Sequence, residues 1–411
     1  MARMKGFQYL TPIDVARQKL FDALQIKKLK VASVALNLAL NRVLAEDVVA
    51  QEDLPRFNRS AVDGYALRAQ DSEEASQFKP KIFKITDGKV VRGRAKQIWT
   101  GNPLPEGADA VVMLEDTKRI GDQVEVWAAL RPFENVSKRG EDVARGETAV
   151  RAGTRLKPHH LGMLNALGLT QVKVYAKPKI AIIATGNELI EPGVKPQANQ
   201  IFESNRTALS ALCSELGSEP LDFGIAKDNV EEISKKIRTA IKKADIVITT
   251  GGTSTGASDL VPEAVNRNGK PGVIVHGIAM RPAMPTALAV VDGKPVLILS
   301  GNPVAAIMGF EVFARPLISR LLGLKREEPR PWIKAKTTRK MAAALGRKTF
   351  VRVRVVEKEG EFLAEPVSAK GSGLISTMTK ANGYVVVPEN CEGLGEGEVV
   401  TVFLFDNIEA C

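Results

Sequence analysis

Cysteine is scarce in this 411-residue chain, which has only Cys213, Cys391 and Cys411. Their spacing matches no structural zinc site, and three cysteines cannot all pair, so we expect a reducing compartment. The first residues show no apolar segment followed by a cleavage site, and no run reaches the roughly 18 to 20 apolar residues that a membrane span needs. These absences argue against a disulfide scaffold and a membrane protein, and they predict a cytoplasmic protein.

Aromatic residues are also few, at 5% of the sequence. The chain is basic, with a formal net charge of +11, but its lysines and arginines are dispersed. No helix-turn-helix, RNP or zinc-finger pattern accompanies them. The sequence therefore predicts no nucleic-acid partner. A basic surface that attracts an anionic small molecule accounts for the same charge.

The segment DIVITTGGTSTGASD, residues 245–259, has the pattern of a buried parallel strand that ends in a loop. The loop contains only small residues before its end, including Gly251, Gly252, Thr253, Ser254 and Gly256. Backbone amides and hydroxyls in such a loop approach an anionic ligand closely, and Asp259 adds a carboxylate. The pattern suits a phosphorylated ligand with a metal. A glycine-rich strand end is, however, equally often a turn or a close contact between strand and helix.

Two further segments repeat this order of residues. KIAIIATGNEL (residues 179–189) and PVLILSGNP (residues 295–303) each have an apolar run, a small hydroxyl residue and then Gly-Asn. In an open α/β sheet, ligands bind outside the carboxyl ends of the strands. We therefore expect the three polar loops to gather around one crevice. Nearby, Asp292-Gly293 predicts a hairpin turn that makes one edge of the sheet antiparallel.

The length of the chain predicts about two to four domains, and the pattern of residues changes along it. Short runs of Val, Ile, Phe and Trp, broken by Gly and Pro, indicate a small β-rich domain over residues 53–137. Residues 178–326 alternate apolar runs with helical patterns, and strand-like alternation returns over residues 327–411. Residues 1–52 and 138–177 remain as a discontinuous helical or linker domain.

Capping residues predict where helices begin. A helix is expected over residues 11–26, with Thr11 as its cap, followed by a short helix over residues 33–44. A longer helix is expected over residues 303–322. Asp228 has the spacing of an N-cap, although a carboxylate at the crevice can also bind a metal.

Taken together, these segments make the chain resemble the molybdopterin molybdenumtransferase family, the MoeA proteins, to which the C-terminal domain of gephyrin is related. The resemblance rests on six segments in the family's order, which are NRSAVDGYALR, WTGNPLPEGADAVVMLED, KRGEDV, IIATGNEL, ITTGGTSTGASD and SGNPVAA. It implies a multidomain α/β and β fold: a helical N-terminal domain, an inserted β-rich domain, a MogA-like three-layer α/β domain and a C-terminal β-barrel. It also implies a homodimer in which the inserted domain of one subunit completes the active site of the other.

The reaction implied by the resemblance belongs to molybdenum cofactor biosynthesis. Molybdenum from molybdate is inserted into adenylylated molybdopterin, and AMP is released with the help of Mg²⁺; tungstate is an alternative oxyanion. Two other functions stay open at this point. One is the adenylyltransferase of the preceding step, which would otherwise be a candidate protein partner, and the other is a non-catalytic dimeric scaffold of the same fold.

The resemblance also assigns roles to individual residues. Those expected to be catalytic are Asp259, Asp228, Glu188, Asp142, Asp63 and Thr100. Three of these would hold Mg²⁺, namely Asp228, Asp259 and Glu188. Those expected to bind the substrate are Gly251, Gly252, Thr253, Ser254, Gly256, Asn205, Arg206, Arg281, Gly301, Asn302 and Ser372.

One segment departs from the family. Where its members usually have Lys-Pro-Gly-Lys-Pro, this chain has RPAMP at residues 281–285. Arg281 keeps the first cation, but Met284 puts a neutral thioether in place of the second. Losing a charged hydrogen bond costs about 1.5–3 kcal/mol, so oxyanion affinity should suffer unless Arg206 or Lys138 compensates.

Overall fold

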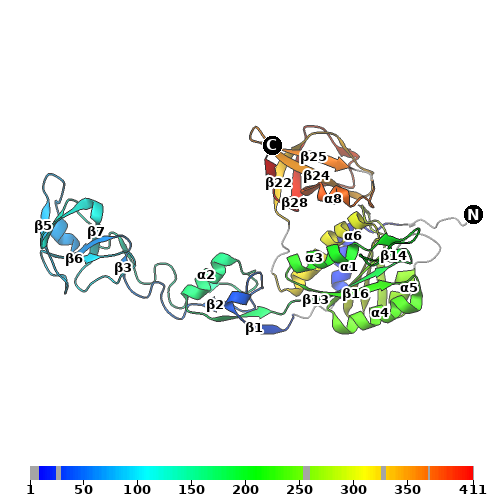
Figure 1. The fold of residues 1–411 in the computed structure, drawn as a ribbon, viewed down its shortest axis with the longest axis horizontal. Helices are drawn as coiled ribbons and strands as arrows, with labels where there is room; N and C mark the ends of the chain where they lie inside the picture. Colours follow the sequence, from blue (N-terminus) through cyan, green and yellow to red (C-terminus); the bar gives the residue numbers. More distant parts are fainter. Residues whose placement is uncertain (1–8, 25–28, 253–259, 325–329, 369–370, 411) are drawn as a thin grey trace, which may run out of the picture. The chain divides into compact units, whose positions relative to one another are not determined.

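The computed structural model describes residues 9–24, 29–252, 260–324, 330–368 and 371–410. The chain divides into two compact units, which we call the main unit (Met1–Ala32 with Tyr175–Cys411) and the inserted unit (Ser33–Val174). In Figure 1 the colours follow the sequence, so the α/β part of the main unit is green to yellow and its C-terminal strands are orange to red. Each unit has its own hydrophobic clusters.

A six-stranded sheet forms the centre of the main unit. Its order is β16 (Glu219–Ala226), β13 (Lys179–Thr185), β17 (Ile246–Thr250), β21 (Lys294–Leu299), β20 (Ala287–Val291) and β18 (Pro271–His276). The first four strands are parallel, and β20 is antiparallel to both of its neighbours. The predicted hairpin is confirmed: Asp292 and Gly293 have φ angles of 50° and 78°, the left-handed backbone of a tight hairpin turn.

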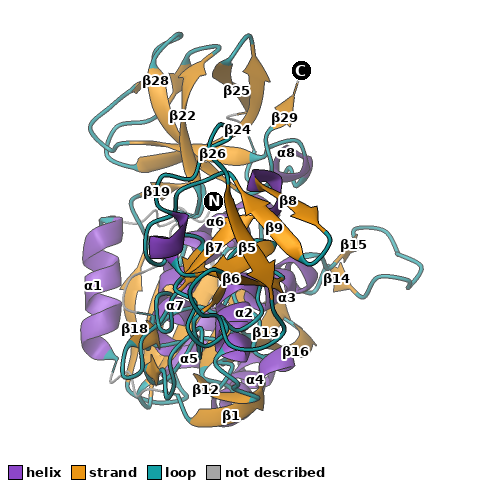
Figure 2. Cartoon of the chain, turned by 90° about the vertical axis from the view of Figure 1, so that its left-hand side faces the viewer, coloured by secondary structure: helices purple, strands orange, loops and turns teal. Residues whose placement is uncertain are grey.

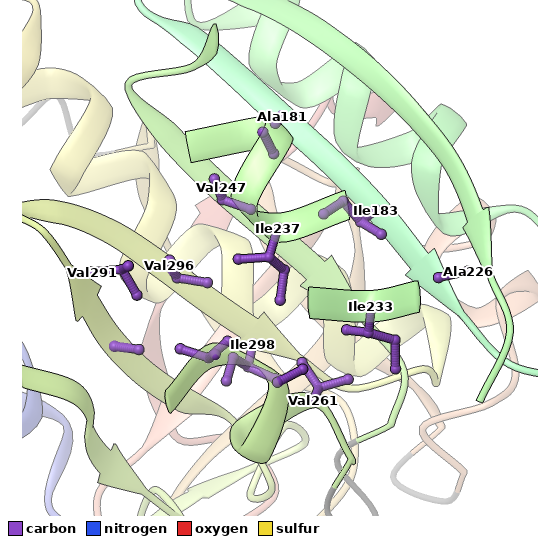
Figure 3. Close-up of a cluster of buried hydrophobic side chains, with 14 of the residues drawn as sticks. Ala181, Ile183, Ala226, Ile233, Ile237, Val247, Val261, Val291, Val296 and Ile298 are labelled. Carbon is purple, nitrogen blue, oxygen red and sulfur yellow. The ribbon is translucent and has the colours of Figure 1, made fainter. Parts of the chain in front are cut away.

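Helices cover both faces of this sheet. Ile233 and Ile237 of α4 (Val230–Lys243) pack with Val261 of α5 (Leu260–Asn266) against Ala181 and Ile183 of β13, as Figure 3 shows. Successive strand residues point to opposite faces, and the intervening residues of β13 are equally buried. The other face is covered by α3 (Asn205–Glu215), which packs on β13 and β16 (Figure 1). The predicted three-layer α/β domain is therefore confirmed.

The long helix expected over residues 303–322 forms in three parts. These are α6 (Pro303–Gly309), a π-helical turn η4 (Phe310–Ala314) and α7 (Arg315–Leu321). Asn302 is the N-cap residue and Pro303 is the first helical residue, where its missing amide hydrogen is harmless.

Five strands after this helix close into a β-barrel. In circular order they are β24 (Lys348–Lys358), β25 (Glu361–Ser368), β22 (Trp332–Thr337), β28 (Val399–Leu404) and β26 (Gly383–Val387), which pairs back with β24. Alternating apolar residues such as Val351, Val353 and Val355 fill its interior. Figure 2 shows these strands in orange. The C-terminal β-barrel that the sequence predicted is confirmed.

The barrel is joined to the α/β domain by a strand and by an ion cluster. The short strand β19 (Met280–Arg281) pairs in parallel with the start of β24, Met280 opposite Lys348 and Arg281 opposite Thr349. Nearby, Glu311 of η4 accepts hydrogen bonds from Arg330 Nη2 at 2.8 Å and from Arg315 Nε at 2.7 Å. Burial alone would raise the pKa of Glu311, but the two guanidinium groups lower it below its usual value.

A second six-stranded sheet dominates the inserted unit. Its order is β7 (Ala110–Met113), β4 (Gly64–Leu67), β6 (Arg94–Ile98), β5 (Lys81–Ile85), β9 (Gln123–Val126) and β8 (Thr117–Ile120). Tyr65, Phe83 and Val124 are central to its core. All six strands lie within residues 53–137, where the sequence predicted a β-rich structure.

The rest of the unit contains α2 (Pro158–Ala166) and two short strand pairs, β2 (Val48–Val49) with β11 (Thr148–Val150) and β3 (Arg59–Ser60) with β10 (Val136–Ser137).

The helix predicted over residues 33–44 is wrong. Val31–Ala35 form strand β1, which pairs with β12 (Gln171–Tyr175), and only a 3₁₀ turn over Leu36–Leu38 follows. Val34 packs against the cluster of Leu36 and Leu44, so a long-range strand pairing overrides the local helical pattern.

The first helix is shorter than predicted. Helix α1 spans Ile13–Ala23, and its N-cap residue is Pro12, so Thr11 does not cap it. The Thr11 backbone instead pairs with the segment before β19: its N–H donates to Gly277 O at 3.0 Å, and its carbonyl accepts from Ala279 N at 2.8 Å. None of the helices in the described part of the chain has the length and apolar character needed to cross a membrane.

Candidate active site

The three polar loops that the sequence analysis grouped together follow adjacent parallel strands. β13 pairs with β17 up to Ala184 opposite Thr250, and β17 pairs with β21 up to Thr250 opposite Leu299. Their carboxyl ends therefore lie at one edge of the sheet, as predicted.

A hydrogen-bond network links two of these strand ends to a helix. Asn205, at the start of α3, donates from Nδ2 to Thr250 Oγ1 at 2.7 Å and to the carbonyl of Gly301 at 2.8 Å. Thr250 in turn donates to the Ser300 carbonyl at 3.1 Å. The amide hydrogens of Asn205 are thus used inside the protein, although its side-chain oxygen still has acceptor capacity.

The glycine pair after β17 is required by packing. A Cβ atom on Gly251 would lie 2.3 Å from the Thr185 carbonyl oxygen, and one on Gly252 would lie 2.5 Å from Val261 Cγ2. The Gly251 amide donates to Leu299 O at 3.1 Å, so it extends the sheet and is not available to a phosphate. Close approach of strand ends therefore explains both glycines, and their expected contact with substrate stays a prediction.

Gly251→Ala should destabilise the main unit by about 3 kcal/mol or more. Its φ of +97° is strained for alanine, which costs about 1–3 kcal/mol, and the clash with Thr185 adds about 1–3 kcal/mol of overpacking. Gly293→Ala is the control, because Gly293 also has a positive φ, +78°, but no atom lies within 4 Å of the new Cβ. Urea unfolding measures the loss in the free energy of unfolding for each variant. Equal losses in the two variants would show that packing at Thr185 is unimportant.

Asp228 does not cap the helix that follows it, contrary to the prediction. The N-cap is Asn229, whose side-chain oxygen accepts from Glu232 N at 3.0 Å. Asp228 instead exchanges two hydrogen bonds with Asn187: its Oδ2 accepts from Asn187 N at 3.2 Å, and its own N–H donates to Asn187 Oδ1 at 3.1 Å. This pair joins the loop after β16 to the loop after β13.

The loop after β13 also carries Glu188, next to Asn187. The carboxylates of Asp228 and Glu188 both belong to exposed residues on these two joined loops. Mg²⁺ prefers oxygen ligands and is commonly held by one or two carboxylates together with substrate phosphates. This donor set fits Mg²⁺ in that mode. Within the described residues no group of three or more His, Cys, Asp or Glu side chains forms a preassembled metal site.

Arg206, predicted to bind substrate, is bound by the protein itself. Its guanidinium donates to Glu203 at 3.1 Å, to Asp222 at 2.6 Å and also to Glu191. Burial lowers the pKa of Arg206, but the hydrogen bonds that it donates to Asp222 and Glu191 outweigh that effect and raise the pKa overall. Glu191 and Glu203 lie at the two ends of the segment that pairs β14 (Leu189–Ile190) with β15 (Ile201–Phe202) and projects in Figure 2. Arg206 therefore anchors this segment and has little capacity left for a ligand.

A cleft of about 390 Å³ lies between the α/β domain and the barrel. Its lining includes the whole RPAMP segment, residues 281–285, together with Asn302 and Ser372. Among the described residues that line it, none is acidic. Asn302 Nδ2 donates to Ser372 Oγ at 3.0 Å, which joins the third strand-end loop to the barrel. The structure thus brings three predicted substrate-binding residues, Arg281, Asn302 and Ser372, to one place.

Three arginines, Arg281, Arg347 and Arg352, are among the described residues that line this cleft. Burial, and next the positive charge of Arg281, lower the pKa of Arg352. Several positive charges at one site, with no carboxylate among the described lining residues, favour a bound anion. The sequence analysis missed Arg347 and Arg352, because they belong to a distant β segment that only the β19–β24 pairing brings here.

The inserted unit contains the other three predicted catalytic residues. Asp63 Oδ1 accepts hydrogen bonds from the Thr100 backbone N–H and hydroxyl, both at 2.7 Å. These two bonds, the backbone bond first, lower the pKa of Asp63 below its usual value. Asp142 is exposed, in a loop whose backbone bonds to Leu54 O at 3.1 Å. Four predicted residues, Thr253, Ser254, Gly256 and Asp259, lie outside the described residues.

The fold and the cleft together define a multidomain protein in which an α/β domain and a β-barrel form a site suited to an anion. Family models match almost the whole chain: the MoeA N-terminal region (domain I and II) over residues 11–168, a probable molybdopterin binding domain over residues 181–320 and the MoeA C-terminal region (domain IV) over residues 334–405. The chain belongs to the MoeA family.

Individual relatives agree with this assignment. A putative molybdopterin biosynthesis protein of Methanocaldococcus jannaschii is 39% identical over 413 residues, covering 98% of this chain and 100% of the relative. A molybdopterin molybdenumtransferase of Staphylococcus aureus is 34% identical over 405 residues, covering 96% of each chain. The crystal structure of the molybdopterin biosynthesis moeA protein from Pyrococcus horikoshii OT3 matches with a TM-score of 0.83 and 32% identity, covering 97% of this chain and 100% of that one.

Proposed function

We propose that this protein inserts molybdenum from molybdate into adenylylated molybdopterin and releases AMP. The observation that carries the proposal is the cleft beside the strand-end loops of a MoeA-family chain, which has three arginines and no acidic side chain among its described lining residues. Relatives at 32–34% identity bear the name molybdopterin molybdenumtransferase. Tungstate is the alternative oxyanion, and the scarcity of cysteine favours a cytoplasmic location.

The cleft residues have chemistry that suits an oxyanion. Arg281 and Arg352 supply charged N–H donors, which form the stronger class of hydrogen bonds to oxyanions. Ser372 presents a hydroxyl that is fixed by its bond from Asn302. Together they would orient a tetrahedral dianion at the mouth of the loops that receive the pterin phosphate.

The carboxylates at the strand ends complete the proposal. Asp228 and Glu188 would hold Mg²⁺, which when bound offsets negative charge on the phosphoanhydride that is cleaved. The mutual hydrogen bonds of Asp228 and Asn187 fix the position of the Asp228 carboxylate. The bond from Asn187 N uses its Oδ2, which leaves Oδ1 for Mg²⁺.

The release of AMP separates this function from its alternatives. Purified protein is given adenylylated molybdopterin and Mg²⁺, with and without molybdate, and AMP is quantified by chromatography. Molybdate-dependent release supports the proposal. Formation of adenylylated molybdopterin from ATP would instead identify an adenylyltransferase, and no turnover in either direction would favour a scaffold.

We further propose a homodimer in which Asp63 and Thr100 of one subunit serve the cleft of the other, as the family resemblance implies. Mixing inactive Asp63→Ala and Arg352→Ala subunits should then restore roughly a quarter of wild-type activity. In a statistical mixture half of the dimers are hybrids, and each hybrid has one intact site out of two. Light scattering and differentially tagged subunits confirm hybrid formation. No recovery in confirmed hybrids would rule out a shared site.

A further inference from the structure

We propose that Arg347 is an oxyanion-binding residue that supplies the positive charge missing at Met284. The ligand class is a tetrahedral dianion, molybdate or tungstate. The inference rests on the proposed function, because it gives that site a specific ligand contact. RPAMP contains a single cation, Arg281. A second cation from Arg347 would explain why the cleft is still basic.

The pairing of β19 with β24 places Arg347 beside RPAMP. Lys348 N donates to Ala279 O at 3.0 Å, and Met280 lies opposite Lys348 in the parallel ladder. The residue before Lys348 is therefore held next to the start of the RPAMP loop. Arg347 is half-buried and lines the same cleft as Met284 and Ser372.

The other two candidates for compensation are engaged elsewhere. Arg206 is buried and bonded to three carboxylates, one of which, Glu203, has a side chain only 3% exposed. Lys138 belongs to the inserted unit, where its ammonium lies 4.5 Å from the centroid of the Phe133 ring. Neither residue belongs to the lining of this cleft in the described part of the main unit.

Arg347, in contrast, has no carboxylate partner among the residues that the structure describes. In the part of the chain that the structure describes, neither Arg281 nor Arg347 forms an ion pair with a carboxylate. Two unpaired guanidinium groups and Arg352 share one cleft, and their mutual repulsion is relieved when a dianion binds. This arrangement explains why a neutral methionine is tolerated at position 284.

Titration with tungstate and molybdate by calorimetry, without any pterin, tests the proposal. Arg347→Gln should raise the dissociation constant for both oxyanions roughly tenfold or more, which is the effect expected for one lost charged hydrogen bond. Arg339→Gln is the matched control, because it removes the same charge from the same domain outside this cleft. Inorganic phosphate is titrated in parallel: a loss confined to phosphate would assign Arg347 to the pterin phosphate and overturn the proposal.

Met284→Lys in two backgrounds makes the test specific for compensation. In the Arg347→Gln background it should recover most of the lost tungstate affinity, and in the wild type it should give a smaller gain. Melting temperatures of all variants exclude misfolding as the cause. Equal gains in both backgrounds would show that the two positions act independently and would contradict the proposal.

The same variants distinguish failure of this inference from failure of the proposed function. With adenylylated molybdopterin, Arg347→Gln should raise the molybdate concentration needed for half-maximal AMP release and leave the rate at saturating molybdate nearly unchanged. An unchanged half-maximal concentration in an active enzyme overturns only the role of Arg347. Weakened tungstate binding in a protein without molybdate-dependent turnover overturns the proposed function and leaves the anion contact intact.

Discussion

Asp228→Asn is expected to reduce molybdate-dependent AMP release at least about a hundredfold while leaving the melting temperature unchanged. The asparagine oxygen can still accept the hydrogen bond from Asn187 N, so the bridge between the two loops is preserved. Only the negative charge is lost, and removing one electrostatic contact to a transition state typically costs about 100- to 1,000-fold in rate. Steady-state rates over a range of Mg²⁺ concentrations measure the effect.

Asp245→Asn is the matched control for this variant. Asp245 also accepts a backbone hydrogen bond, from Lys179 N at 2.8 Å, but it lies at the amino end of the parallel strands, away from the loops. It should retain wild-type activity. Near wild-type turnover of Asp228→Asn at limiting Mg²⁺ would remove Asp228 from the catalytic set.

Arg206→Met should have the largest effect on stability, a loss of about 3–5 kcal/mol. Breaking a buried ion pair from one side leaves an uncompensated charge, here the carboxylate of Glu203. It also releases both ends of the segment between β14 and β15. Urea unfolding, followed by circular dichroism, gives the change in the free energy of unfolding of the main unit.

A surface arginine with two carboxylate partners provides the comparison. Arg267 bonds Glu231 at 3.0 Å and Glu263 at 2.6 Å, but its side chain is 48% exposed, so Arg267→Met should cost no more than about 1 kcal/mol. Adding Glu203→Gln to Arg206→Met should recover part of the loss, because it removes the unpaired charge. Similar losses for both arginine variants would mean that burial of Glu203 is unimportant.

Local patterns in the sequence predicted much of the architecture. The apolar runs that end in Gly-Gly or Gly-Asn are parallel strands with adjacent carboxyl ends, and Asp292-Gly293 is the hairpin turn. Alternation after residue 327 marked the barrel strands. These predictions succeeded because strand periodicity and turn chemistry depend on neighbouring residues.

The predictions that failed depend on contacts distant in sequence. Residues 33–44 have a helical pattern, yet the pairing of β1 with β12 makes their start a strand. Contacts of the same kind surround Arg206, because only the fold brings Glu191, Glu203 and Asp222 to it. Its role in substrate binding stays a prediction. Arg352 belongs to no motif that could indicate its place in the cleft.

The most direct measurement of the proposed function is the molybdenum content of the pterin product. The protein is incubated with adenylylated molybdopterin, Mg²⁺ and molybdate, and the product is analysed by mass spectrometry while AMP is quantified in the same sample. If the account is right, each AMP released is matched by one molybdenum atom bound to the pterin dithiolene, and Arg352→Ala abolishes both. AMP release that needs no molybdate, with a product that contains no molybdenum, would contradict it.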